Sequence, residues 1–516
     1  MSLTIRQMIA QCIMPRISAN EYYDSAEVRH AAWELVSEHG IGGWCVFQGD
    51  AIATARMIKE LQQRSAIPLL ISADFEFGLA MRLQGGTSFP HAMALGRLDD
   101  VKATFAVAQA IAKEARALGI HWNFAPVCDI NSDKLNPIIN IRAFGETPEE
   151  VGKHGSAYIQ GTQTEHVMAC AKHFPGHGDT KADSHIELPT LPFDKTRLSA
   201  LELLPFKQVI SAGVQSVMVG HLAIPALDDS GRPASLSYKI MTELLREELG
   251  FQGVITTDAL DMNAIINHYD NDTASVLAFA GGADVVLLPT SALGALSAIE
   301  QAVHNGTISE ERVRASYQRV YAMKEWTGAI SAENPARKIN VEAIDVNIHA
   351  HQTLALETAR RAGEWFGAYT DILPMSKYKQ FAAFALVTEK DMDAAQSFFT
   401  YTAQLSEHDC DMAFVNADIS EEQILEYQEG TQSADIIIFA IFVRANAYQG
   451  TIRLPERLEA IAPRLAQGKP TIAVLFGNPY IRETFPASAF LCMYSSSEGS
   501  LAGAAFHLFK SDEMSS

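Results

Sequence analysis

Residues 216–220 (SVMVG), 239–249 (KIMTELLREEL) and 254–257 (VITT) form the stretch that decides the fold. The two apolar runs are four or five residues long, which is typical of strands buried on both faces of a parallel sheet. The segment between them has apolar residues at helical spacing. A strand, a helix and a second strand in this order predict a parallel α/β architecture.

The same pattern continues on both sides of this stretch. Amphipathic segments at 102–118, 198–212 and 292–304 alternate with further short apolar runs. These runs are residues 12–17, 43–47, 68–72, 122–126, 168–172 and 284–288. Eight strand candidates alternating with helices over about 300 residues predict an N-terminal (β/α)8 TIM-type barrel.

A second, shorter α/β series follows. Helix candidates at 391–403, 421–429 and 455–466 separate five apolar runs, at 381–387, 412–415, 436–442, 471–476 and 490–494. This order predicts a smaller α/β/α sandwich domain after the barrel. We expect a barrel domain at 1–340 and a sandwich domain at 341–516. No Gly-x-Gly-x-x-Gly motif follows a strand candidate, so a dinucleotide cofactor has no support.

Composition restricts the possible partners and compartment. Lys and Arg number 40 against 61 Asp and Glu, a net charge of −21, which argues against nucleic acid and anionic membranes as partners. The six cysteines include no Cys-x-x-Cys pair and are expected to be buried free thiols of a reducing compartment. The longest apolar run, 436–443, is far too short to span a bilayer. We therefore expect a cytoplasmic protein without a membrane span.

Polar residues end five of the eight predicted barrel strands. A barrel places its chemistry at the carboxyl ends of its strands, because the loops there surround one shared mouth. Any single polar strand end can be a cap or a satisfied buried group, but five together indicate a functional site. They are Asp74, Asp129, the pair Lys172 and His173, His221, and Asp258.

The densest of these segments is residues 172–185, KHFPGHGDTKADSH. Proline and two glycines favour a structured loop over a helix. The histidines and aspartates of this loop could bind a metal, hold the loop together by hydrogen bonds, or perform acid–base catalysis. In the third case Asp183 raises the pKa of His185 and fixes its tautomer, which makes His185 a general acid. These residues alone do not decide between the three interpretations.

Asp258 follows the apolar run 254–257 directly. An ionised carboxylate at a strand end can act as a nucleophile, and opposite a proton donor it forms the arrangement of a retaining glycosidase. It could equally cap the next helix, and Asp261 is an alternative three residues later. Asp74 and Arg82, eight residues apart, suit bidentate binding of sugar hydroxyls or form an ordinary ion pair. Arg142 is a further donor in another loop.

Together these motifs resemble glycoside hydrolase family 3. KHFPGHG followed by DSH, a strand-end aspartate and an upstream Asp/Arg pair are similar to the β-N-acetylglucosaminidase branch of that family over residues 5–330. The resemblance implies that Asp258 is the nucleophile and that His185 is the acid/base, with Asp183 as its partner. It also implies that the sugar is bound by Asp74, Arg82, Arg142, Lys172 and His173.

The resemblance further implies the activity. We expect a retaining exo-β-N-acetylglucosaminidase that acts on a small carbohydrate or muropeptide, either peptidoglycan fragments or chitooligosaccharides, with no metal or other cofactor. The alternatives are a β-glucosidase, β-xylosidase or phosphorylase of the same family, a metal-dependent hydrolase, and a sugar-binding barrel without activity. EDTA and the choice of aryl glycoside discriminate between them. The sequence does not indicate an oligomeric state.

Overall fold

The computed structural model describes residues 3–180, 184, 186–331, 339–406, 410–445 and 450–510. Within them the chain divides into two compact units. Unit 1 contains residues up to 87, 100–136 and 143–348, and unit 2 contains 88–99, 137–142 and the residues from 349 onward. The boundary at residue 340 stays a prediction, and the two short segments that group with unit 2 have no signal in the sequence.

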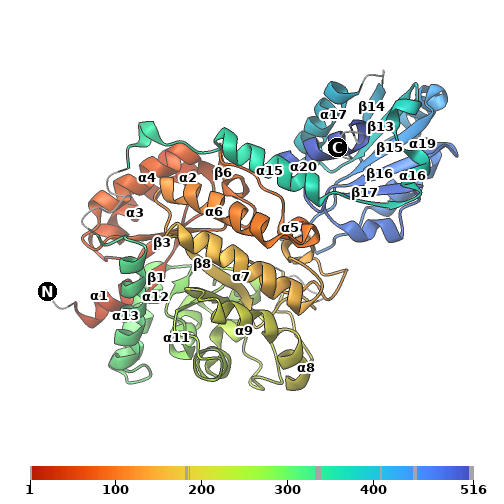
Figure 1. Cartoon of the computed structure of the whole chain (residues 1–516). Helices are drawn as coiled ribbons and strands as arrows, with labels where there is room; N and C mark the ends of the chain where they lie inside the picture. The colour runs from red at the N-terminus through yellow and green to blue at the C-terminus, as the bar shows by residue number, and fades with distance from the viewer. Residues whose placement is uncertain are drawn as a thin grey trace. The chain divides into compact units, whose positions relative to one another are not determined.

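Unit 1 is a ring of parallel strands, and all eight predicted barrel strands are present. Figure 1 shows this unit in colours that run from red to green. The first is divided by Pro15, which has no N–H for a ladder, into β1 and β2. β1 pairs with β11, β2 pairs with β3, and an isolated bridge between Thr256 and Val285 joins β10 to β11. The strands are β1 (Ile13–Met14), β2 (Arg16–Ile17), β3 (Gly43–Val46), β5 (Leu70–Ala73), β7 (Trp122–Asn123), β8 (Met168–Phe174), β9 (Ser216–Val219), β10 (Val254–Thr257) and β11 (Val286–Leu287).

Helices connect these strands, and local capping residues define where several of them begin. Asp50, Asp100 and Thr147 each accept a backbone N–H of the first turn of the helix that follows, which satisfies a donor without an intrahelical partner. The main helices are α3 (Ala26–Ser37), α4 (Ala51–Arg64), α6 (Val101–Ala117), α7 (Pro148–Thr164), α9 (Leu203–Ser211), the π-helix Lys239–Glu248, α11 (Asn271–Gly281), α12 (Ala292–His304) and α13 (Glu310–Trp326).

Unit 2 is the predicted α/β/α sandwich. Its six strands have the order β12-β17-β16-β15-β13-β14, and all pairs are parallel except β12 with β17. Two apolar clusters cover the two faces of the sheet, one with Phe398 and Leu501 and the other with Ile424 and Leu458. The strands are β12 (Glu364–Gly367), β13 (Phe381–Leu386), β14 (Cys410–Val415), β15 (Ile436–Ile441), β16 (Thr471–Leu475) and β17 (Ala489–Cys492).

The helices of unit 2 contribute side chains to those two clusters. α17 (Met392–Leu405) and α20 (Glu498–Phe509) supply the first, while α18 (Glu421–Gly430) and α19 (Glu456–Ala466) supply the second. α15 (His349–Ala362) and α5 (Ala92–Leu98) complete the unit. All six cysteines are free thiols, and five of them are buried, as predicted. Within the described part of the chain, no helix is both long enough and apolar enough to cross a membrane.

Candidate active site

A buried charged cluster joins the carboxyl ends of β5 and β8. Asp74 follows β5, and its Oδ1 atom lies 2.8 Å from Lys172 Nζ in β8. Arg82 Nη2 lies 2.9 Å from Asp74 Oδ2. Lys172 Nζ also lies 2.8 Å from Glu76 Oε1, and Lys172 is only 2% exposed. One ammonium and one guanidinium thus compensate two carboxylates at the barrel mouth.

The electrostatics of this cluster keep Asp74 charged. Burial raises the pKa of the Asp74 carboxyl. The nearby Lys172 and Arg82 lower this pKa by more than burial raises it, so the net pKa is below the usual value. Asp74 is therefore ionised at neutral pH. A fixed carboxylate beside two cations offers both acceptors and donors, which is the combination that recognises sugar hydroxyls.

The strand that carries Lys172 is irregular at this point. In β8, Ala171 pairs with Val217 and Phe174 pairs with Val219, so two residues of β8 oppose the single Met218 of β9. A bulge of this kind redirects side chains and is common beside active sites. It explains how the adjacent residues Lys172 and His173 both contribute polar contacts at the mouth.

His173 and the loop after it are organised around the buried carboxylate of Asp129. The Oδ2 atom of Asp129 lies 2.7 Å from His173 Nδ1, and the backbone N–H groups of His173 and His177 also donate to the carboxylate. Burial raises the pKa of Asp129, but His173 and His177 lower it more, and the net pKa is below its usual value. Because a carboxylate only accepts, Nδ1 of His173 carries a proton.

His177 supports the loop from inside. Its Nδ1 lies 2.7 Å from Thr180 Oγ1, and its Nε2 lies 3.0 Å from Ser184 Oγ. Burial lowers the pKa of His177 to about 4, so the ring is neutral at neutral pH. Gly178 lies so close to Ile130 that a Cβ atom would stand 1.6 Å from the Ile130 carbonyl oxygen, which requires glycine there.

Asp258 lies at the end of β10, where the sequence predicted it. Its backbone N–H donates to the Val219 carbonyl at 2.9 Å, and its Oδ1 accepts the Ala259 N–H at 2.8 Å. Burial raises the pKa of the Cys170 thiol to about 12, Lys172 lowers it, and Asp74 and Asp258 raise it. β10, β9 and β8 are neighbouring parallel strands, so Asp258 at the end of β10 lies at the same edge of the sheet as Lys172 in β8.

Asp261, the alternative to Asp258, has a different environment. Its Oδ2 lies 3.3 Å from Arg16 Nη1, and burial raises its pKa above the usual value despite that cation. Asp258 directly follows β10, whereas Asp261 lies three residues later and is paired with Arg16. The geometry therefore favours Asp258 as the nucleophile candidate.

The roles of three predicted site residues stay predictions. Asp183 and His185 lie outside the described residues, so their roles stay predictions. Arg142 groups with unit 2, where its Nη1 donates to the Ile138 carbonyl at 2.7 Å. Its part in sugar binding also stays a prediction.

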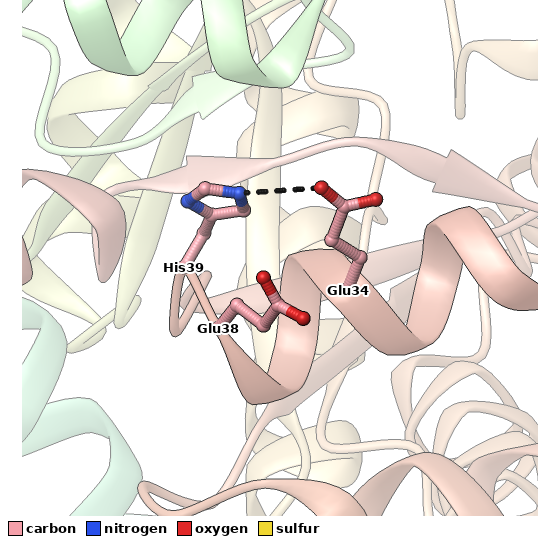
Figure 2. Close-up of side chains that lie close together, drawn as sticks. All are labelled: Glu34, Glu38 and His39. Atoms are coloured by element: carbon pink, nitrogen blue, oxygen red, sulfur yellow. Dashed lines mark ion pairs between the residues drawn. The ribbon is translucent and has the colours of Figure 1, made fainter.

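The described residues give little support to the hypothesis that the loop at 172–185 binds a metal. His173 and His177 direct their Nδ1 atoms to Asp129 and Thr180, as given above. Among the described residues, one group could place three ligand atoms together, namely Glu34, Glu38 and His39 on and just after α3 (Figure 2). Figure 2 shows the His39 ring directed toward Glu34, at 3.8 Å, while both glutamates are exposed. Clusters of this kind are common on protein surfaces.

Sequence reasoning missed two members of the site. Glu76 was visible two residues after Asp74, at the spacing that places two strand-end side chains on one side of an extended chain. Asp129 was noted as a polar strand end without a role, and its function as the anchor of His173 and His177 depends on contacts between residues 44 and 48 positions apart. Only the tertiary fold brings these groups together.

Comparisons with known proteins agree with this geometry. The model of the glycosyl hydrolase family 3 N-terminal domain matches residues 4–323, and the chain therefore belongs to glycosyl hydrolase family 3. It is an enzyme of the glycoside hydrolase class. Beta-hexosaminidase A of Pseudoalteromonas piscicida is 37% identical over 325 residues, which are 56% of this chain. That match spans 54% of the relative, so the chain covers about half of its length.

Two further relatives cover more of both chains. A beta-N-acetylglucosaminidase/beta-glucosidase of Cellulomonas fimi is 26% identical over 85% of this chain and 81% of its own. The solved structure of a glycoside hydrolase family 3 beta-N-acetylglucosaminidase from Paenibacillus sp. FPU-7 superposes with a TM-score of 0.85 at 30% identity. It covers 99% of this chain and 97% of that one, so the relative includes counterparts of both units.

Proposed function

We propose that this glycosyl hydrolase is a retaining exo-β-N-acetylglucosaminidase. The observation that carries the proposal is the buried cluster of Asp74, Lys172 and Arg82 at the carboxyl edge of the parallel sheet whose strand β10 ends at Asp258. The name of the Paenibacillus relative, a beta-N-acetylglucosaminidase, supports the N-acetyl specificity, and the name of the Pseudoalteromonas relative, a beta-hexosaminidase, supports a hexosaminide substrate. The substrates are then terminal β-linked N-acetylglucosamine residues of peptidoglycan fragments or chitooligosaccharides.

The reaction would proceed in two steps. Asp258 attacks the anomeric carbon, the bond from this carbon to the leaving oxygen breaks, and protonated His185 gives its proton to that oxygen. Water then attacks the anomeric carbon of the glycosyl-enzyme, His185 takes the proton of the water, and Asp258 leaves as a carboxylate. Two inversions give net retention of configuration. Asp183 stabilises the charged form of His185 in this scheme.

In the same scheme, the buried charges bind the sugar. Asp74 accepts hydrogen bonds from hydroxyls while Lys172 and Arg82 donate to them, and His173 and Arg142 are further binding residues. The ion pair between Asp74 and Lys172 orients both groups before the sugar arrives, which reduces the entropy lost on binding. Metal participation is not required by any of these steps.

The first experiment compares two aryl substrates in the presence of EDTA. We expect p-nitrophenol release from the β-N-acetylglucosaminide and little from the β-glucoside. Activity on the glucoside alone would contradict the N-acetyl specificity, and an absence of activity on both would contradict the proposal as a whole. The Cellulomonas relative carries both activities in its name, so turnover of both substrates is the second candidate function. Added phosphate that changes the product to a sugar phosphate would indicate a phosphorylase.

A second experiment tests the nucleophile. Asp258→Ala should lose several orders of magnitude in turnover, because the covalent route is gone. Azide should restore activity by attacking the anomeric carbon in place of the carboxylate, and the product should be the glycosyl azide of inverted configuration. A variant that keeps its activity, or that azide does not rescue, would contradict the role of Asp258.

A third experiment tests the acid. His185→Ala should slow substrates with poor leaving groups far more than dinitrophenyl glycosides, because a good leaving group departs without a proton. His268→Ala, at an exposed histidine of the same unit, is the matched control and should leave both rates unchanged. Equal losses with all leaving groups would contradict the acid role.

A further inference from the structure

His221 is a fully buried histidine at the barrel mouth to which the proposed reaction assigns no task. It follows β9 by two residues and is 0% exposed. Its Nε2 lies 2.8 Å from the Ala259 carbonyl oxygen, and its Nδ1 lies 2.6 Å from Ser235 Oγ. Because a carbonyl only accepts, Nε2 carries the proton, and in a neutral ring Nδ1 accepts from the Ser235 hydroxyl.

The backbone that His221 holds belongs to the residue directly after Asp258. The Ala259 N–H donates to the Asp258 carboxylate, and the Asp258 N–H donates to Val219. On the other side, the Leu260 N–H donates to the Leu287 carbonyl at 3.0 Å. The peptide after Ala259 is thus held at both ends, at its carbonyl by His221 and at its N–H by the β11 strand end, while β9 holds the peptide that precedes Asp258.

We infer that His221 is a positioning residue that orients the Asp258 carboxylate through the Ala259 backbone. The inference rests on the proposed role of Asp258 as the nucleophile. The Ala259 N–H binds the Asp258 carboxylate, and the Ala259 carbonyl binds the His221 imidazole. The backbone of one residue therefore links the two side chains. A rotation of the Ala259 carbonyl changes the backbone torsions of Ala259, and the compensating change shifts the Ala259 N–H and the carboxylate bound to it.

Such a movement should affect turnover more than binding. A displacement of a reacting group by about 1 Å lowers rates on the order of 100-fold, because attack needs a narrow range of distance and angle. The sugar-binding candidates Asp74 and Lys172 lie at the ends of β5 and β8, whereas His221 acts on the backbone that follows β10. We therefore expect kcat to fall and KM to stay nearly unchanged.

Two substitutions test the two hydrogen bonds of the His221 imidazole separately. The amide nitrogen of glutamine reaches about as far as Nε2, so His221→Gln keeps the donor to Ala259. The amide of asparagine ends near Nδ1, so His221→Asn keeps a partner for Ser235 but loses the donor to Ala259. We expect kcat of the glutamine variant to stay within about 5-fold of the parent and that of the asparagine variant to fall on the order of 50- to 100-fold.

The pH profile distinguishes a positioning role from an acid–base role, while the fall in kcat at constant KM distinguishes it from a general loss of stability. A positioning residue that does not exchange protons with the substrate leaves the apparent pKa values of kcat/KM unchanged when glutamine replaces it. Ser235→Ala, which removes only the hydroxyl at Nδ1, should lower kcat by a few-fold with the same KM. It keeps the test informative where His221→Asn does not fold.

His121→Asn is the matched control. His121 is also a buried barrel histidine, 3% exposed, whose Nδ1 accepts the Ile71 N–H at 3.2 Å. It precedes β7 and so lies at the amino end of the barrel, opposite the proposed site. The variant should melt at a lower temperature and keep kcat.

The outcomes distinguish the inference from the proposal on which it rests. If Asp258→Ala stays active, the proposed function is wrong. If Asp258→Ala is inactive and rescued by azide while His221→Asn keeps parental kcat, or while His221→Gln falls as far as His221→Asn, the inference is wrong. If His221→Asn does not fold, the Ser235→Ala variant decides instead, and a kcat equal to that of the parent enzyme would overturn the inference.

Discussion

Replacement of Lys172 by methionine tests whether the buried cluster at the barrel mouth is held by charge. Lys172 is 2% exposed, and its Nζ lies 2.8 Å from both Asp74 Oδ1 and Glu76 Oε1. Methionine keeps a similar length and an apolar stem but removes the ammonium. The variant therefore leaves the carboxylates of Asp74 and Glu76, with side chains only 15% and 8% exposed, without the cation that they share, while Arg82 still contacts Asp74.

The expected loss of stability follows from this burial. Removal of one partner of a buried ion pair destabilises a protein by about 3–5 kcal/mol, because the remaining charge is desolvated without compensation. For a barrel of roughly 300 residues, an unfolding entropy of about 2.1 cal/mol/K per residue gives about 0.6 kcal/mol/K. Lys172→Met should then lower Tm of the barrel by about 5–8 °C at pH 7.

The pH dependence of this loss has a definite sign. In the parent, Lys172 and Arg82 outweigh burial and hold the pKa of Asp74 below its usual value. Without Lys172, burial raises that pKa, so the folded variant binds protons more readily than the parent does. The stability gap between parent and variant should therefore become smaller as the pH falls from 7 to 5. Differential scanning calorimetry at several pH values measures this gap.

Lys113→Met is the control for a surface pair. Lys113 Nζ lies 3.9 Å from Glu165, and its side chain is 52% exposed. Exposed pairs contribute about 0–1 kcal/mol, so this variant should shift Tm by less than about 2 °C. A loss in Lys172→Met that does not depend on pH would refute the electrostatic reasoning and attribute the effect to packing. An unchanged Tm would refute it as well.

Three further predictions concern titration and metals. Burial lowers the pKa of Lys324 from 10.5 to about 7, so between these pH values the unfolded chain binds more protons and stability should rise with pH. Lys324→Met should remove this slope in urea unfolding at pH 7–10. Burial lowers the pKa of His177 from 6.5 to about 4, so stability should fall as the pH drops through this window, and near-UV circular dichroism should show a shallower acid transition in His177→Gln. EDTA should leave the turnover of aryl substrates unchanged, whereas a loss that Zn²⁺ reverses would argue for a metal site.

Much of the architecture could be predicted because its signals are local. The eight short apolar runs, the amphipathic segments between them and the polar residues that follow the strands can all be read within a few positions. The second domain is similar, although β12 was missed. Two of its four residues are exposed and two are partly buried, because it joins the sheet as an antiparallel edge strand. It therefore carries no strong apolar pattern.

The sequence by itself determined the barrel, the sandwich and the candidate residues Asp74, Lys172, His173 and Asp258, since each depends on spacing along the chain. Only the tertiary structure decided which charges compensate one another. The Asp74–Lys172 pair joins residues 98 positions apart, and its geometry follows from the order of the strands around the ring. The physical reason is that hydrogen bonds and charge pairs act through space, whereas a sequence pattern reports only the local preference of the backbone.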